Sequence, residues 1–333
     1  MSARNIVVIA SGCAVLCVGF FLFALFGPHR SDPVRDIPIP RGASLIDIGR
    51  ILEDSGAIHS ALVFTVAAKL SGKGGHLQSG TYRFPARATT AEILDALATG
   101  RWIVDVWVTI PEGSTIRNIA VILRKHLGLD SAAFVRATQN PALLRRWEIP
   151  ASSMEGYLFP DTYQIRLGTP ADRIIARMYT RLINSIPPAF RERMVQQGVS
   201  LHETLTMASI IEGETRKPEE RARVAGVYYN RLRKGIPLQA DPTIQYIIPD
   251  GPRRLLYRDL RLKSPYNTYR RRGLPPGPIN SPGLAAIEAA LYPERHDYLY
   301  FVADGSGGHR FSRTSAEHET AVRAYRRFLE GKE

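Results

Sequence analysis

An unbroken run of 21 uncharged residues near the N-terminus, 6–26, constrains this 333-residue chain more than any other feature. A helix of about 20 apolar residues is long enough to cross the hydrocarbon core of a bilayer. The run is too long for a typical signal-peptide core and no A-x-A-like site follows it, although cleavage remains an alternative. We therefore predict an uncleaved single-pass anchor in the inner (cytoplasmic) membrane. Residues 1–5 form a cytoplasmic tail, and the bulk of the chain lies on the periplasmic, or extracytoplasmic, side.

Both cysteines of the chain, Cys13 and Cys17, lie inside this run. The exported portion therefore has no disulfide, no thiol chemistry and no cysteine-based metal site. The eight histidines are scattered, so the sequence predicts no metal and no cofactor. An outward location also argues against nucleic acid as the partner.

The formal net charge of +13 is concentrated in one segment. Residues 216–272 hold 15 basic and 5 acidic side chains, a local excess of 15 − 5 = +10, whereas residues 31–100 hold 7 of each. A cluster of this kind favours an anionic partner such as acidic lipid headgroups or a polymer that carries carboxylates. A solvated basic face is the alternative.

The sequence repeats itself at an offset of 71 residues. Residues 39–52 align with residues 110–123, and each copy reads as a strand, a Pro-x-Gly turn and a capped helix, followed by a second helical stretch. The capping and aromatic positions are Ser44 and Phe64 in the first copy, and Ser114 or Thr115 and Phe134 in the second. This strand, helix, helix pattern resembles LysM-like modules that bind glycans containing N-acetylglucosamine. A duplicated module with only a structural role is the alternative.

The remaining elements indicate an α+β fold. We predict strands at 80–84, 101–110 and 298–302, and helices at 90–97, from Ser200 onward, at 218–235 and from 315 onward. Asp241-Pro-Thr is interpreted as one of several turns between 241 and 283. The predicted domains are a linker at 27–38, a LysM-like region at 39–145 and a mixed α+β domain at 146–333.

One acidic residue lies at an unusual position in the helix that begins after Ser200. Leu201, Leu205, Ala208 and Glu212 share one helical face. Burial among apolar neighbours disfavours ionisation, so the pKa of Glu212 is expected to rise toward the range of a general acid. Glu214 falls on a different face. The alternative is that Glu212 simply pairs with one of the nearby arginines.

Other catalytic chemistries lack their residues. His202-Glu203 begins like a zinc-protease helix, but Thr206 occupies the position of the required second histidine. No Gly-x-Ser-x-Gly elbow, P-loop or dinucleotide fingerprint is present. Carboxylate acid/base chemistry remains.

Five motifs in this part of the chain, taken in order, resemble the endolytic murein transglycosylase (YceG-like) family. They are Ala208-Ser-Ile-Ile-Glu-Gly-Glu-Thr215, Asn230-Arg-Leu232, Leu238-Gln-Ala-Asp-Pro-Thr243, Tyr266-Asn-Thr-Tyr269 and Gly273-Leu-Pro-Pro-Gly277. Residues 155–163 and 298–311 extend the resemblance, which covers about residues 5–328. One departure is Gly213, where members of the family often carry a charged residue.

The resemblance implies a lyase that cleaves the β-1,4 bond between N-acetylmuramic acid and N-acetylglucosamine in nascent peptidoglycan strands. The product ends in 1,6-anhydro-N-acetylmuramic acid, and cleavage ends strand elongation. Glu212 would act first as the acid and then as the base, so no second carboxylate is needed, although Glu214 and Asp241 are candidates. The implied partners are glycan strands, the membrane and peptidoglycan synthases. The implied substrate contacts are Asn230, Gln239, Asp241, Tyr266 and Asn267.

Two other functions remain open at this point. One is a muramidase-type hydrolase that uses water and a second carboxylate on the same glycan. The other is a non-catalytic, peptidoglycan-binding scaffold of the cell-wall synthesis complex.

Overall fold

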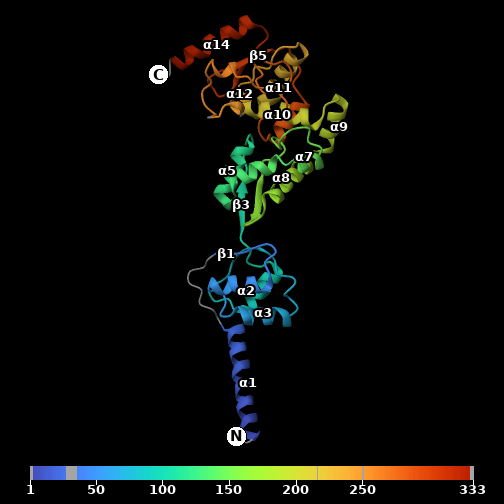
Figure 1. Cartoon of the computed structure of the whole chain (residues 1–333). Helices are drawn as coiled ribbons and strands as arrows, with labels where there is room; N and C mark the ends of the chain where they lie inside the picture. Colours follow the sequence, from blue (N-terminus) through green and yellow to red (C-terminus); the bar gives the residue numbers. More distant parts are fainter. Residues whose placement is uncertain (1–2, 28–35, 216, 250, 331–333) are drawn as a thin grey trace. The chain divides into compact units, whose positions relative to one another are not determined.

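The computed structural model describes residues 3–27, 36–215, 217–249 and 251–330 and has a mixed α+β architecture. The chain forms two compact units (Figure 1). One consists of Met1–Trp107 and Gln164–Thr169, and the other of Val108–Tyr163 and Pro170–Glu333. Strands β3 (Asp105–Thr109) and β4 (Thr162–Arg166), which pair with each other, carry the chain from one unit to the other.

The first unit packs three short helices on a two-stranded sheet. Its elements after α1 are β1 (Asp36–Ile39), α2 (Leu45–Asp54), α3 (Ala61–Leu70), β2 (Gly80–Arg83) and α4 (Thr90–Thr99). The strands are antiparallel, with Asp36 opposite Arg83 and the two side chains ion-paired at 2.7 Å. Leu52, Phe64 and Tyr82 are fully buried in the core.

Helix α1 (Ala3–Phe26) packs its last turns on the same core. Phe21 and Leu25 lie against the core residues, and the buried Thr90 hydroxyl donates a hydrogen bond to the Ala24 carbonyl at 2.8 Å. No helix within the described residues has both the length and the apolar character needed to cross a membrane. Many side chains of the predicted anchor at 6–26, and most of the predicted linker at 27–38, lie outside the described residues.

The second unit is largely helical. After β3 its elements are α5 (Ile116–Leu127), α6 (Ser131–Thr138), α7 (Pro141–Arg146), β4, α8 (Ala171–Ser185), α9 (Pro188–Gln197), α10 (Leu201–Glu214), α11 (Pro218–Arg233), α12 (Asp241–Ile247), a short 3₁₀ helix (Asp259–Arg261), α13 (Leu284–Leu291), the antiparallel pair β5 (Tyr300–Ala303) and β6 (His309–Ser312), and α14 (Ser315–Glu330).

Both copies of the repeat have the predicted order of strand, turn, helix and helix. Ser44 caps α2 through a capping box with Asp47, and Thr115 caps α5 in the same way with Asn118. The two copies belong to different compact units, however, because the second copy follows Trp107. The predicted LysM-like region at 39–145 therefore includes residues of both compact units. The domain boundaries inferred from the sequence stay predictions.

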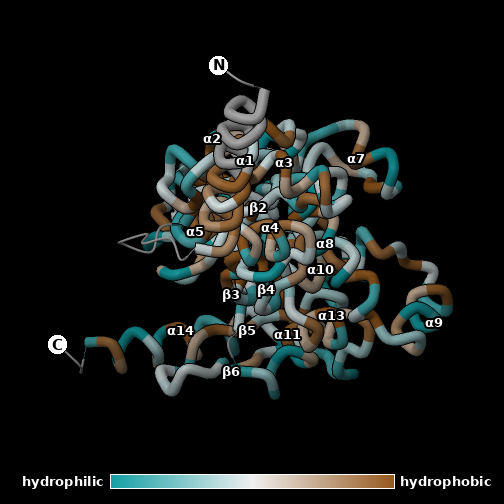
Figure 2. Tube along the Cα trace, turned by 90° about the horizontal axis from the view of Figure 1, so that it is seen from below, coloured by the Kyte–Doolittle hydropathy of each residue, from teal (hydrophilic) through white to brown (hydrophobic). Residues whose placement is uncertain are grey.

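Helix α10 lies at the centre of the second unit, packed on α11, α12 and α13. The helix begins at the predicted Ser200 cap, which forms a capping box with Glu203. All residues from Thr204 to Ile211 are buried, so burial is not confined to the face that Leu201, Leu205, Ala208 and Glu212 share. Figure 2 contrasts the hydrophobic sequence of its neighbour α13 with the mainly hydrophilic α9.

Two predicted elements differ from those observed. Asp241-Pro-Thr begins helix α12 rather than forming a turn, because proline is compatible with the first helical turn, where its missing N–H has no intrahelical partner. The strand predicted at 101–110 starts only at Asp105. Trp102 has a φ of 66°, a left-handed conformation that interrupts an extended chain.

The core of the first unit gives a stability prediction. Phe64→Ala should lower the free energy of unfolding by about 3–5 kcal/mol, since it removes a fully buried aromatic ring. The matched control is Leu62→Ala on the same helix, because Leu62 is 72% exposed and its truncation should change stability by less than about 0.5 kcal/mol. Denaturant titration followed by circular dichroism compares the two. Equal losses would contradict the packing described for this unit.

Candidate functional site

Glu212 lies in the last turn of α10, and its side chain is only 7% exposed. Two groups hold its carboxylate. The Arg221 Nη2 group of α11 donates to Oε1 at 3.0 Å, and the backbone N–H of Gly283 donates to Oε2 at 3.0 Å. The arginine pairing considered from the sequence is therefore present.

Arg221 is shared between two carboxylates. Its Nη2 atom also lies 3.6 Å from Oε2 of Glu112, and its side chain is 9% exposed whereas that of Glu112 is 49% exposed. Its buried Nε atom has no hydrogen-bond partner in the described part of the chain. The cation of Arg221 thus lies between two carboxylates, those of Glu112 and Glu212. Arg221 and Glu212 are shielded from water, whereas Glu112 is not.

The pKa of Glu212 is raised above its ordinary value, as predicted. Burial is the largest cause, and the nearby Glu112 charge acts in the same direction. The hydrogen bond from Gly283 and the charge of Arg221 oppose the shift. Such a balance leaves a carboxyl group that can both release and accept a proton, which acid/base catalysis requires.

The two other candidate acids have their own partners. The Tyr228 hydroxyl donates to Glu214, and the Tyr269 hydroxyl donates to Asp241. Burial raises the pKa of Glu214 to about 7. Glu212 and Glu214 thus contact different residues of α11, Arg221 and Tyr228, and Glu212 also contacts Gly283.

A cavity of about 750 Å³ opens beside the end of α10. Gly113 and Gly213 line it. Glu212 is not among the lining residues, but it precedes Gly213 in the chain, and its Cγ atom lies 3.7 Å from the position that a Cβ on Gly113 would occupy. A side chain on Gly213 would meet Pro242 Cβ at 2.7 Å, so glycine permits this approach of α12 to α10. The polar lining residues include Arg117, Glu155, Glu214, Asp241, Tyr246 and Asn280.

The structure brings only some of the predicted substrate residues to this cavity. Asp241 lines it, and the ring of Tyr266 lies 5.1 Å from that of the lining residue Tyr246. Gln239 does not line it and accepts a hydrogen bond from Arg231 at 3.2 Å. Asn267 is fully buried, and its amide donates to the carbonyls of Leu260 and Leu262.

Asn230 belongs to another part of the unit. Its amide donates to the carbonyl groups of His296 and Tyr298, at 2.8 and 2.9 Å, and fixes α11 to the segment before β5. It lines a separate pocket of about 760 Å³ that includes Arg193 and Arg233. Asn230 and Asn267 therefore serve local structure in this conformation.

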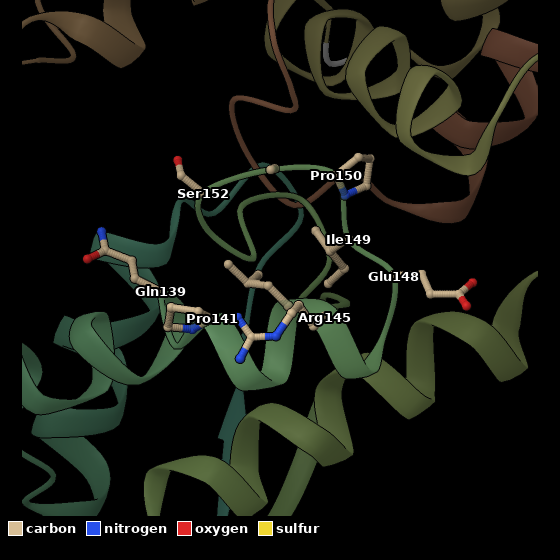
Figure 3. A pocket seen from close by; sticks show the side chains of 9 residues that line it. Gln139, Pro141, Arg145, Glu148, Ile149, Pro150 and Ser152 are labelled. Carbon is tan, nitrogen blue, oxygen red and sulfur yellow. The ribbon is translucent and has the colours of Figure 1, made fainter.

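A third pocket, of about 660 Å³, lies between the end of α6 and the loop after α7 (Figure 3). Its lining residues all come from 139–152, and Glu148 points away from the hollow in Figure 3. It contains none of the predicted site residues. Of the predicted site residues, Asp241 lines the cavity beside Glu212.

The basic segment is only partly available to a ligand. Arg253 forms an ion pair with Asp259 at 2.7 Å, whereas Arg254, Arg271 and Arg272 are exposed. Contact between these exposed arginines and an anionic polymer stays a prediction.

Sequence reasoning missed the groups that hold Glu212 and those that line the cavity. Glu112 lies in the Pro-x-Gly turn of the second repeat and Glu155 in the aromatic motif at 155–163, so both were within segments that the sequence marked. Arg221 is one of many arginines after Glu212, and spacing alone could not select it. Gly283 acts through its backbone, which no side-chain pattern reveals.

The site is a buried, ion-paired carboxyl group next to a polar cavity in an α+β unit, and the comparisons with known proteins assign a family to it. The chain belongs to the YceG-like family, whose sequence model matches residues 37–324. The endolytic murein transglycosylase of Bacillus subtilis is 33% identical over an alignment of 322 residues, and the match covers 90% of this chain and 89% of the relative.

Two further proteins are similar over most of the chain. The endolytic murein transglycosylase of Streptococcus pneumoniae is 33% identical over an alignment of 302 residues, and the match covers 82% of this chain but 54% of the longer relative. A crystal structure of a YceG-like protein from Listeria monocytogenes matches with a TM-score of 0.61 and 35% identity. That match covers 86% of this chain and 98% of the Listeria chain.

Because Arg221 lies between two carboxylates, two substitutions should shift the pKa of Glu212 in opposite directions. Glu112→Gln removes a negative neighbour and should lower the pKa of Glu212, whereas Arg221→Met removes the positive neighbour and should raise it. Nuclear magnetic resonance titration of ¹³C-labelled glutamate measures both shifts. Glu219→Gln, at an exposed site on α11, is the control and should leave the pKa unchanged. Shifts of the same sign in both variants would contradict the shared arrangement.

Proposed function

We propose that this protein is an endolytic lytic transglycosylase that cleaves peptidoglycan glycan strands, with Glu212 as its catalytic acid and base. The observation that carries the proposal is the buried carboxyl of Glu212 beside the cavity, held by Arg221 and Gly283. The names of the Bacillus and Streptococcus relatives support the same reaction.

In the proposed reaction, protonated Glu212 gives its proton to the oxygen that bridges N-acetylmuramic acid and N-acetylglucosamine. The bond from that oxygen to the anomeric carbon breaks. The C6 hydroxyl of the muramyl residue then attacks the anomeric carbon, and Glu212 takes the hydroxyl proton. The ring that forms is the 1,6-anhydro product, water is not consumed, and Glu212 ends protonated again.

A single catalytic carboxyl is consistent with what surrounds the site. Glycoside hydrolysis normally uses two carboxyl groups, one of which activates water or forms a covalent intermediate. Here Glu214 and Asp241 are hydrogen-bonded to tyrosines, and Glu112 faces Arg221. An internal nucleophile on the substrate removes the need for a second group.

Glu212→Gln should lower kcat on isolated glycan strands by about a hundredfold to ten-thousandfold, because glutamine cannot transfer the proton. Chromatography of the products with mass spectrometry measures the rate and identifies the ends. Glu219→Gln should cleave at the wild-type rate, as should any exposed substitution away from the cavity. Full activity of Glu212→Gln would remove Glu212 from the mechanism.

The product mass separates the proposal from its rivals. A hydrolase gives a reducing end that is heavier than the anhydro end by one water molecule. A scaffold gives no cleavage by the wild type or by the variant.

We further propose that residues 6–26 anchor the protein in the cytoplasmic membrane and that the two compact units face the extracytoplasmic side. The uncharged run and the resemblance of most of the chain to cell-wall enzymes support this topology. Synthases as partners and glycan binding by the LysM-like copies stay predictions.

The membrane proposal has a direct test. The full chain should sediment with membranes and resist carbonate extraction, while a chain that starts at residue 28 should not. External protease should digest the full chain in spheroplasts but not in intact cells. Release of the full chain by carbonate, or its protection in spheroplasts, would contradict the anchor or the topology.

A further inference from the structure

Helix α3 of the first unit has apolar side chains on its outer side as well as in the core. One side of the helix, which includes Phe64, is buried. Leu62, Val66 and Leu70 follow one another at intervals of four residues along another side, and Leu62 and Leu70 are 72% and 79% exposed. The outer side of a surface helix is normally polar, so this exposed apolar stripe calls for an explanation.

The second copy of the repeat is an internal comparison for the stripe. Phe64 of α3 and Phe134 of α6 are the equivalent buried aromatic residues of the two copies. With these two aligned, the three stripe positions are occupied in the second copy by short or polar residues, Ala132, Arg136 and Asn140. The module therefore folds without an apolar outer side. The stripe belongs to the copy whose compact unit contains α1.

Helix α1 leaves the first unit beside α3, with which it is in contact (Figures 1 and 2). The ring of Phe23 stacks on that of His59, with 5.9 Å between the ring centroids, and His59 directly precedes Ser60, the N-cap of α3. The hydrogen bond from Thr90 to the Ala24 carbonyl holds the same turn of α1 on α4. The start of α3 is thus fixed to the end of α1.

The last turns of α1 have a protein side and an open side. Phe21 and Leu25 lie against the core of the unit, whereas Phe23 and Phe26 are 63% and 59% exposed. These exposed aromatic side chains belong to the run that we propose as the membrane anchor. If lipid surrounds them, the membrane reaches the end of α1 and therefore also the start of α3.

The length of the anchor indicates the same depth. Its part before the turns that pack on the unit, residues 6–20, has 15 residues and would span about 22 Å as a helix. The hydrocarbon core of a bilayer is about 30 Å thick. The span is complete only when the turns that pack on the unit lie within the membrane as well.

The charge of α3 is also typical of a helix at a membrane surface. Lys69 is the only charged residue in the sequence of this helix, and it is exposed next to Leu70. A lysine side chain can lay its methylene groups along apolar surface while its ammonium group reaches the headgroups. Anionic headgroups attract such a charge. An apolar side bordered by a basic residue is the pattern of a helix that lies in the plane of the interface.

We propose that the outer side of α3 docks on the lipid bilayer, with Leu62, Val66 and Leu70 against the acyl chains and Lys69 among anionic headgroups. The inference rests on the proposed membrane anchor, because it gives the first unit a second contact with the same bilayer. Helices α1 and α3 together then hold this unit against the membrane surface in one orientation.

Spin labels on the full chain in vesicles of phosphatidylethanolamine and phosphatidylglycerol test this contact. Cys13→Ala and Cys17→Ala first remove the native thiols, and Leu62→Cys or Leu70→Cys then carries the label. Power-saturation electron paramagnetic resonance compares collisions with oxygen, which concentrates in the acyl region, and with a nickel chelate, which stays in water. The ratio of oxygen to nickel collisions at both positions should exceed that of a water-exposed label severalfold.

The second copy supplies the matched controls. Arg136→Cys and Asn140→Cys label the equivalent exposed positions and should collide freely with the nickel chelate. Val15→Cys, at an exposed position on α1, reports the anchor itself and should show the high ratio. The thermal midpoint of each variant reports folding, and Val66→Cys replaces a stripe variant that does not fold.

The outcomes separate the docking of α3 from the anchor. Nickel collisions at Leu62→Cys and Leu70→Cys equal to those at Arg136→Cys, with Val15→Cys in lipid, overturn the docking and leave the anchor and the enzyme assignment intact. Protection of the stripe labels from both reagents means that protein covers α3, which overturns lipid contact. A label at Val15→Cys in water overturns the anchor first, and the docking with it.

Discussion

A short backbone bridge between two distant segments organises the whole site. The Gly113 N–H donates to the Ser281 carbonyl at 2.8 Å, and the Ser281 N–H donates to the Ser114 carbonyl at 2.9 Å. This bridge joins the turn after β3 to the segment before α13. It brings Glu112 from one side, and Asn280 and Gly283 from the other, to the end of α10. Since these bonds involve only backbone groups, they hold the segments together whatever their side chains do.

The bridge also explains why the two copies of the repeat have different surroundings. In the first copy the turn carries Arg41 and Gly42, and a Cβ on Gly42 would meet nothing within 4 Å. In the second copy the equivalent residues are Glu112 and Gly113, and Gly113 packs near Cγ of Glu212. The same local chemistry of turn and cap forms both, so only tertiary contacts set them apart. A duplicated module has thus become part of the site in one copy alone.

Local features of the fold could be predicted from the sequence, whereas features that depend on tertiary contacts could not. The cap at Ser200, the repeat and the position of Glu212 depend on spacing within a few residues, and local patterns reveal them. The burial of α10 on all sides depends on α11, α12 and α13, which no helical stripe indicates. Asn230 and Asn267 looked like cleft residues because polar side chains near turns often bind ligands. Their amides instead satisfy backbone carbonyls, a role that sequence cannot separate from ligand binding.

The arrangement around Glu212 addresses a conflict in its proposed role. An acid that is held only by Arg221 would stay ionised and could not protonate a leaving group, whereas an acid that is only buried would hold its proton too tightly to release it. Glu112 moderates this conflict, because it competes for the same guanidinium from the exposed side.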